Sequence, residues 1–225
     1  MGSPRLLAID TATEACSVAV DTADGRVLEE YVVAINAHSQ LLLPMIQRVL
    51  DRVDCTLADV GAIACGVGPG GFTGVRIGVS TAQALAIARG LPVYPVSSLQ
   101  ALAATVPRPQ VLAALDARRG EVYAGVFRQD AQAIPRLQGV EKVCAPEAVN
   151  WPATGHWWGL GTGWQVYHAH WRDAGVLGWS GDSFPRAGAV LRLARARIQA
   201  GDRGIAPVLL EPHYIRPSLS EEGRQ

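Results

Sequence analysis

Residues 66–78 read Gly66-Val67-Gly68-Pro69-Gly70-Gly71-Phe72-Thr73-Gly74-Val75-Arg76-Ile77-Gly78, and this glycine-rich stretch is the most informative part of the chain. The apolar run that precedes it, residues 62–67, predicts a short buried strand. The alanine-rich run that follows predicts a helix ending near Arg89. A strand, a tight turn and a helix start in direct succession are typical of α/β proteins.

A glycine turn at a helix start serves one of two purposes. Its backbone N–H groups can accept an anion beside the positive end of the helix dipole, or its glycines can let another backbone approach closely. The stretch is not a nucleoside-triphosphate P-loop, because that loop ends in Gly-Lys-Ser/Thr and Lys142 is the only lysine here. It is not a dinucleotide fingerprint either, because Gly68, Gly70 and Gly71 do not fit G-x-G-x-x-G.

The chain around this stretch predicts one α/β subdomain in residues 1–105. Its elements are expected in the order βββαβαβα. The strands are expected over residues 5–10, 15–21, 26–34, 59–67 and 92–96, and the helices over residues 39–53, from the glycine turn to 89, and over residues 97–105. Ser39 is the expected N-cap of the first helix.

A weak internal repeat predicts a second, related subdomain in residues 106–225. After a linker at residues 105–109, a strand over residues 110–116 ends in Asp116, as the first strand ends in Asp10. A second strand is expected over residues 121–129. Beyond it, only a strand near residues 157–161, a helix over residues 186–200 and a docked tail at residues 212–217 are expected. The prediction is a duplicated α/β fold whose second half is reduced.

Composition limits the class of protein. The chain has 225 residues, is 49% hydrophobic and has a formal net charge of zero, which argues against a free-standing nucleic-acid binder. No apolar run reaches the roughly 18 residues of a membrane span, and the chain enters a strand at Arg5 without a signal peptide, so we expect a cytoplasmic protein. The cysteines form no C-x-x-C pair and are expected to be free thiols.

Polar residues at the strand ends are the candidates for chemistry. Asp10, Thr11 and Thr13 offer a carboxylate and two hydroxyls, which can orient a metal-bound water or a phosphate, although the threonines can equally cap the turn. The candidate nucleotide or phosphate contacts are Asp10, Thr11, Thr13, Gly68, Gly70 and Asp116. The histidines form no metal-binding motif and no G-x-S-x-G elbow exists, so we assign no catalytic residue and no metal ligand.

The two long helices of the first half predict a protein interface. The first carries a wide apolar face, and the second carries small residues four apart, at Gly74, Gly78, Ala82 and Ala86. Together they offer more apolar surface than one sheet covers. The candidate interface residues are Leu42, Met45, Ile46, Val49, Thr73, Arg76, Ile77, Ser80 and Ala84.

These residues resemble the TsaB family, also called YeaZ. The similarity is carried by residues 9–13 (Ile-Asp-Thr-Ala-Thr), by His38-Ser39 with Leu42-Leu43-Pro44, and above all by residues 68–78. It continues through residues 95–99, residues 116–118 and residues 120–123, and ends at residues 212–216. Position 71, usually serine in the family, is glycine here, and position 75, usually leucine, is valine.

The resemblance implies a fold and a role. The fold is that of actin, Hsp70 and sugar kinases (ASKHA). The role is that of a non-catalytic subunit in the formation of N6-threonylcarbamoyladenosine (t6A) in tRNA. Its implied partners are the catalytic paralogue TsaD and the ATPase TsaE, with pairing and homodimer formation through the two helices. Ser98 and Leu102 stand where the paralogue has its metal-binding histidines. No cofactor is therefore expected to bind this chain tightly, ATP and Mg²⁺ belong to the complex, and tRNA is reached only through it.

Two other functions stay open on the sequence alone. An independent ATP-dependent enzyme of the same fold would use Asp10 and Asp116 to hold metal and phosphates, although sugar kinases of this fold are normally much longer. A peptidase is the third reading, and no nucleophile–base pair supports it.

Overall fold

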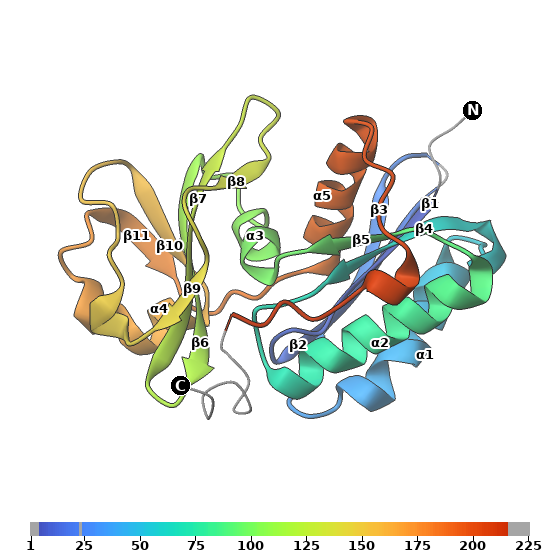
Figure 1. Cartoon of the computed structure of the whole chain (residues 1–225), viewed down its shortest axis with the longest axis horizontal. Helices are drawn as coiled ribbons and strands as arrows, with labels where there is room; N and C mark the ends of the chain where they lie inside the picture. The colour runs from blue at the N-terminus through green and yellow to red at the C-terminus, as the bar shows by residue number, and fades with distance from the viewer. Residues whose placement is uncertain (1–4, 23, 216–225) are drawn as a thin grey trace.

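A computed structural model describes residues 5–22 and 24–215 of the 225-residue chain. Two β-sheets lie side by side, one in each half of the molecule (Figure 1). The first sheet has five strands in the spatial order β3-β2-β1-β4-β5. The second has six: five lie in the spatial order β11-β10-β6-β7-β8, and β9 also pairs with β7. Among the described residues no helix is long and apolar enough to cross a membrane.

The first half has the predicted βββαβαβα order. Its elements are β1 (Arg5–Asp10), β2 (Ala15–Asp21), β3 (Val27–Val33), α1 (His38–Arg52), β4 (Val60–Gly66), α2 (Phe72–Arg89), β5 (Val93–Val96) and α3 (Ser98–Ala103). The expected Ser39 cap is wrong, because α1 begins at His38 and no side chain caps it. His38 is buried, and its Nε2 lies 3.2 Å from the carbonyl oxygen of Ala15, so packing against β2 fixes the start of the helix.

The second half repeats this plan in reduced form. Its elements are β6 (Gln110–Arg118), β7 (Glu121–Gln129), β8 (Pro135–Leu137), β9 (Lys142–Cys144), β10 (Trp157–Leu160), α4 (Thr162–Tyr167) and β11 (Val176–Ser180). Hairpin β6–β7 corresponds to hairpin β1–β2, and β10 pairs with β6 in parallel as β4 pairs with β1. The expected duplication is therefore confirmed, whereas β8, β9, α4 and β11 are elements that the sequence analysis misses.

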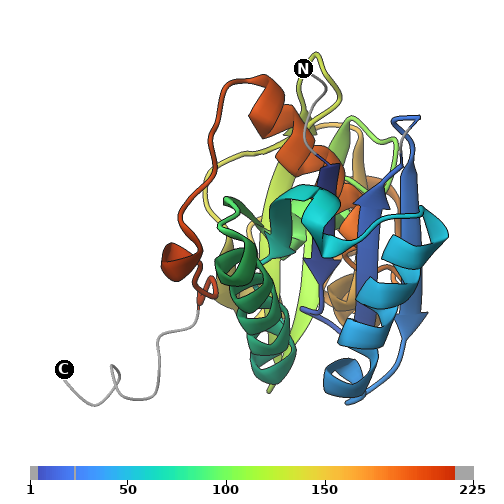
Figure 2. The same ribbon diagram turned by 90° about the vertical axis from the view of Figure 1, so that its right-hand side faces the viewer.

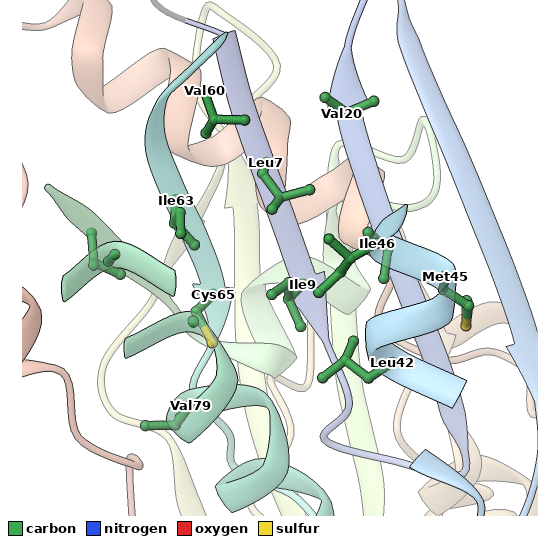
Figure 3. Close-up of a cluster of buried hydrophobic side chains, with 14 of the residues drawn as sticks. Leu7, Ile9, Val20, Leu42, Met45, Ile46, Val60, Ile63, Cys65 and Val79 are labelled. Atoms are coloured by element: carbon green, nitrogen blue, oxygen red, sulfur yellow. The ribbon is translucent and has the colours of Figure 1, made fainter. Parts of the chain in front are cut away.

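Helices cover both faces of the first sheet. On one face lie α1 and α2 (Figure 2). Figure 3 shows Leu42 and Ile46 of α1 in the same buried cluster as Leu7 and Ile9 of β1. On the other face lies α5 (Ala187–Gln199), whose Val190 and its apolar neighbours pack against β1 and β4. Short 3₁₀ helices complete the chain at Leu57–Asp59, Pro146–Ala148, His168–Trp171 and Pro207–Leu209.

The position of α5 corrects the predicted domain boundary. The sequence assigns residues 106–225 to the second subdomain, but α5 buries its apolar face on the first sheet. The chain after α5 also returns there, since Ile205 pairs with Val93 of β5 through backbone hydrogen bonds. The second subdomain therefore ends before Ala187. The repeated strand pattern does not predict that the chain returns to the first sheet. The sequence of α5 shows an apolar face but does not indicate which sheet that face packs on.

Candidate functional site

The glycines of the turn are required by the chain itself. Added Cβ atoms would come far inside van der Waals distance of the end of β1 and of the loop between β1 and β2. The close approaches are from Gly66 onto Asp10, from Gly70 onto the Ala12 carbonyl, from Gly74 onto the Thr11 carbonyl, and from Gly78 onto the Thr11 hydroxyl. The Gly71 N–H also donates to the Ala12 carbonyl oxygen at 2.7 Å. Of the two readings of this turn, the structure supports close backbone approach.

Asp10 is buried inside this contact. Its side chain is 1% exposed, and its carboxylate accepts hydrogen bonds from the Ala12 N–H at 3.0 Å and the Ser98 hydroxyl at 3.3 Å. The Gly68 N–H donates to the same Ser98 hydroxyl oxygen at 3.2 Å. Because burial disfavours the charged form, the pKa of Asp10 is raised to about 6. The carboxylate thus ties β1 to the glycine turn and to α3.

The remaining residues of the first loop are engaged in the same way. The Thr11 hydroxyl is buried and donates to the Gly74 carbonyl oxygen at 2.7 Å. The Thr13 hydroxyl accepts from the Ala15 N–H at 3.3 Å, as a turn cap does. These contacts correct the prediction that Asp10, Thr11, Gly68 and Gly70 present a phosphate site. The Asp10 carboxylate, the Thr11 hydroxyl and the Gly68 N–H already form hydrogen bonds within the chain, and Gly70 packs on Ala12.

Asp116 lies in a different place from Asp10. Its carboxylate accepts from the Arg118 N–H at 2.9 Å and from the Tyr167 hydroxyl at 3.2 Å, and the Arg118 guanidinium lies 3.1 Å from it. Arg118 also pairs with Glu14 of the first half. Asp116, Arg118 and Glu14 line a cavity of about 480 Å³ that Asp10 does not reach. The structure therefore does not bring the two repeated aspartates into one site.

The predicted interface residues of α1 are core residues. Leu42, Met45, Ile46 and Val49 are between 0% and 5% exposed and belong to the cluster under the first sheet. Their helical spacing reflects packing within the chain, which corrects the prediction that they meet a partner. Large apolar side chains exposed on α1 are limited, over the part of the chain that is described, to Leu43.

The predicted residues of α2 lie mostly on its outer face. Thr73, Arg76, Ser80 and Ala84 are exposed, and Ile77 is partly buried. The small-residue stripe of the same helix faces inward, because Gly74 and Gly78 pack on Thr11 while Ala82 and Ala86 are buried. Phe72 at 65% and Ile87 at 56% are exposed at opposite ends of the outer face, and the sequence analysis misses both.

The C-terminal segment lies against the glycine turn. The His213 N–H donates to the Val67 carbonyl oxygen at 2.7 Å, and the His213 Nε2 lies 3.5 Å from the largely buried carboxylate of Glu141. Glu141 also accepts a hydrogen bond from the Ser97 hydroxyl, and the hydrogen bond between His213 and Glu141, together with the charge of Glu141, raises the pKa of His213. The tail expected at residues 212–217 is thus docked as far as residue 215, and residues 216 and 217 lie outside the described residues.

Ser98 and Leu102, the two positions where the resemblance predicts that this chain lacks metal ligands, are both buried. The Ser98 hydroxyl is hydrogen-bonded to the Asp10 carboxylate and to the Gly68 N–H, and Leu102 packs in the core of the second sheet. Within residues 5–22 and 24–215, no three His, Cys, Asp or Glu side chains lie close enough to hold a metal ion.

Comparison with known proteins identifies relatives over nearly the whole chain. The family model described as "TsaD: tRNA N6-adenosine threonylcarbamoyltransferase" matches residues 32–153. The tRNA threonylcarbamoyladenosine biosynthesis protein TsaB of Escherichia coli is 39% identical, over 96% of each chain. The structure of YeaZ from Pseudomonas aeruginosa superposes with a TM-score of 0.86 and 39% identity, over 94% of this chain and all of that one.

A more distant structure supports the fold alone. Component A of (R)-2-hydroxyglutaryl-CoA dehydratase from Acidaminococcus fermentans aligns with a TM-score of 0.50 and 12% identity, over 89% of this chain and all of that one. Together with the duplicated sheets, this likeness confirms the actin/Hsp70/sugar-kinase (ASKHA) fold that the resemblance to the TsaB family implies.

Proposed function

Because the chain belongs to the TsaB family, whose named members are tRNA threonylcarbamoyladenosine biosynthesis proteins, we propose that it is a non-catalytic subunit in t6A formation. It acts by binding a TsaD-type catalytic paralogue and supporting a TsaE-type ATPase. Its place of action is then the cytoplasm, where tRNA is modified. ATP and Mg²⁺ bind at the level of the complex, and tRNA contacts this chain only through the complex.

One observation carries the proposal: the loop that would hold a phosphate is filled by the chain itself, whereas the outer face of α2 is open. Asp10 is satisfied by Ala12 and Ser98, and the glycine turn is packed on the β1–β2 loop. The same packing holds α2 rigidly and directs Phe72, Arg76 and Ala84 outward. A fixed helix with exposed aromatic, apolar and arginine side chains suits protein binding.

The likeness to the TsaD family model supports a related chain as the partner. The match over residues 32–153 includes both α1 and α2, so a TsaD-type subunit carries an equivalent pair of helices. Two copies of such a surface form an isologous dimer about a twofold axis. A paralogue with the same helices can replace one copy, so we propose a homodimer in isolation and a heterodimer with TsaD.

The alternative, an independent ATP-dependent enzyme, requires a charged and accessible Asp10. The burial of this side chain and the separate cavity at Asp116 favour the subunit over the enzyme. Asp10→Asn distinguishes the two, because asparagine keeps the shape and can bond to Ala12 and Ser98 but cannot ligate a metal as a carboxylate does. If the chain is a non-catalytic subunit, the Asp10→Asn variant should still support t6A formation in the reconstituted reaction. If the chain is an enzyme that uses Asp10, the variant should lose t6A formation.

The interface is tested by a bulky charge on the outer face of α2. Ala84→Arg is expected to abolish binding to the TsaD-type subunit and t6A formation, because an arginine replaces an exposed methyl group at the contact. Ala200→Arg is the matched control, since Ala200 is also exposed but follows α5 on the opposite side of the sheet. The Ala200→Arg variant should retain both binding to the TsaD-type subunit and t6A formation. Normal binding and t6A formation by Ala84→Arg would contradict the assignment of this face.

A further inference from the structure

Two exposed aromatic rings and an arginine form a stack where the C-terminal segment meets α2. The rings of Phe72 and Tyr214 have centroids 6.0 Å apart and planes 28° apart. The guanidinium carbon of Arg76 lies 3.3 Å from the Phe72 centroid and 5.2 Å from the Tyr214 centroid. Phe72 is 65% exposed and Tyr214 is 49% exposed, so the stack is open to a partner.

The stack is held in place from both sides. Phe72 and Arg76 are one turn apart on α2, and the packing of Gly70 and Gly74 on the β1–β2 loop fixes this end of the helix. Tyr214 follows His213, whose backbone N–H donates to Val67 and whose ring pairs with Glu141. In Figure 1 the C-terminal segment runs past the start of α2. Side chains fixed in this way lose little conformational entropy when a partner binds.

Arg76 has no acidic partner among the described residues. No hydrogen bond or ion pair joins its guanidinium to another described residue. Other exposed arginines, such as Arg48 with Glu30 and Arg136 with Asp130, do pair with carboxylates. A guanidinium stacked on a ring keeps the N–H groups at its edge available, and their fork matches the two oxygens of a carboxylate.

We propose that Phe72, Arg76 and Tyr214 form a preorganised anchor of the partner-binding face, and that Arg76 receives a carboxylate side chain of the TsaD-type subunit. This inference rests on the proposed function and extends the interface from α2 onto the C-terminal segment. Stacked aromatic and arginine side chains are the residue types that contribute most at protein interfaces. The apolar Phe72 beside Arg76, together with the zero net charge of the chain, favours an acidic protein side chain over an RNA phosphate.

The test is calorimetric titration of the full chain with the TsaD-type subunit. Arg76→Gln is expected to weaken binding by roughly 10- to 100-fold, as loss of a charge-assisted bidentate pair does. Arg76→Lys should weaken it nearly as much, because lysine keeps the charge but neither stacks nor forks. Tyr214→Ala should weaken binding in the same direction. Arg89→Gln, at the exposed last turn of the same helix, is the control and should bind within about twofold of wild type.

Each alternative gives a different result. Full affinity of Arg76→Gln, or full rescue by Arg76→Lys, overturns the carboxylate anchor while leaving the proposed function intact. Normal subunit binding by Arg76→Gln with weaker tRNA binding by the complex assigns Arg76 to an RNA phosphate and also overturns it. Failure of the wild-type chain to bind the subunit would overturn both proposals.

Discussion

Replacement of Gly70 by alanine tests the packing role of the glycine turn. A Cβ at this position would lie 2.1 Å from the carbonyl oxygen of Ala12 and 2.9 Å from its carbonyl carbon. Ordinary contact begins near 3.4 Å, so α2 and the β1–β2 loop must separate by more than about 1 Å. That movement also breaks the hydrogen bond from the Gly71 N–H to Ala12.

The expected loss is large for a single methyl group. Overpacking costs about 1–3 kcal/mol and the lost hydrogen bond about 1 kcal/mol, so Gly70→Ala should lower the free energy of unfolding by about 2–4 kcal/mol. For a chain of this size that corresponds to a fall in Tm of roughly 5–15 °C. Calorimetry or circular dichroism on heating measures it directly.

Gly71→Ala provides a matched control one residue away. Its added Cβ would lie 3.7 Å from the Ala12 carbonyl oxygen, and its φ of −63° suits any residue. The change should alter stability by less than about 1 kcal/mol, because the weaker N-cap and the stiffer unfolded chain offset each other. Equal stability of the Gly70→Ala and Gly71→Ala variants would refute the packing account. Marked stabilisation of the wild type by phosphate or nucleotide would instead favour the anion reading.

Further predictions concern charged groups. The pKa of Asp10, raised from 3.8 to about 6, means that the folded state binds more protons than the unfolded state between these values, so stability falls as pH rises from about 4 to 6. Asp10→Asn should remove this slope and gain up to about 3 kcal/mol at pH 7 in urea titrations, and an unchanged slope would contradict the burial argument. The pKa of His213 is raised by Glu141, so their pair stabilises the C-terminal segment below the ordinary pKa near 6.5 and loses this effect as pH rises through the raised value. Hydrogen-exchange protection of the His213 amide should therefore decrease at alkaline pH in wild type but not in His213→Gln. Glu14→Gln removes only the exposed pair between Glu14 and Arg118, because Arg118 keeps its contact with Asp116, and should change Tm by no more than the equivalent of about 1 kcal/mol; a larger fall would assign that pair a main part in holding the halves together.

The first half of the fold could be predicted because its signals are local. Each element is specified by a pattern in its own segment. The strands alternate apolar with smaller or polar residues, the first helix has apolar residues at 42, 45, 46 and 49, and glycines mark the strand-to-helix turn. The repeat of Asp10 at Asp116 indicated the duplication. The segment around α4 and β11 has no such pattern, because its Trp and Gly residues follow neither the spacing of a helix nor the alternation of a strand. Strands β8 and β9 span three residues each, too few for a pattern.

The site could be predicted only in part, because burial is decided by distant residues. The apolar face of α1 indicates that something covers it, but not whether the cover is the chain's own sheet or a partner. Likewise, Asp10 stands at a turn in the sequence, where a carboxylate is expected to be exposed. It is buried because α3 places the Ser98 hydroxyl against it. The stack of Tyr214 on Phe72 joins residues far apart in the chain, and no local pattern in either segment encodes it.

Light scattering on a sizing column measures directly whether the chain pairs with a catalytic paralogue. The chain is run alone, then mixed with the TsaD-type subunit. We expect a homodimer when the chain is alone, and in the mixture a heterodimer with one copy of each chain, formed at the expense of the homodimer. A chain whose mass and elution do not change in the presence of the TsaD-type subunit would show that the two proteins do not pair.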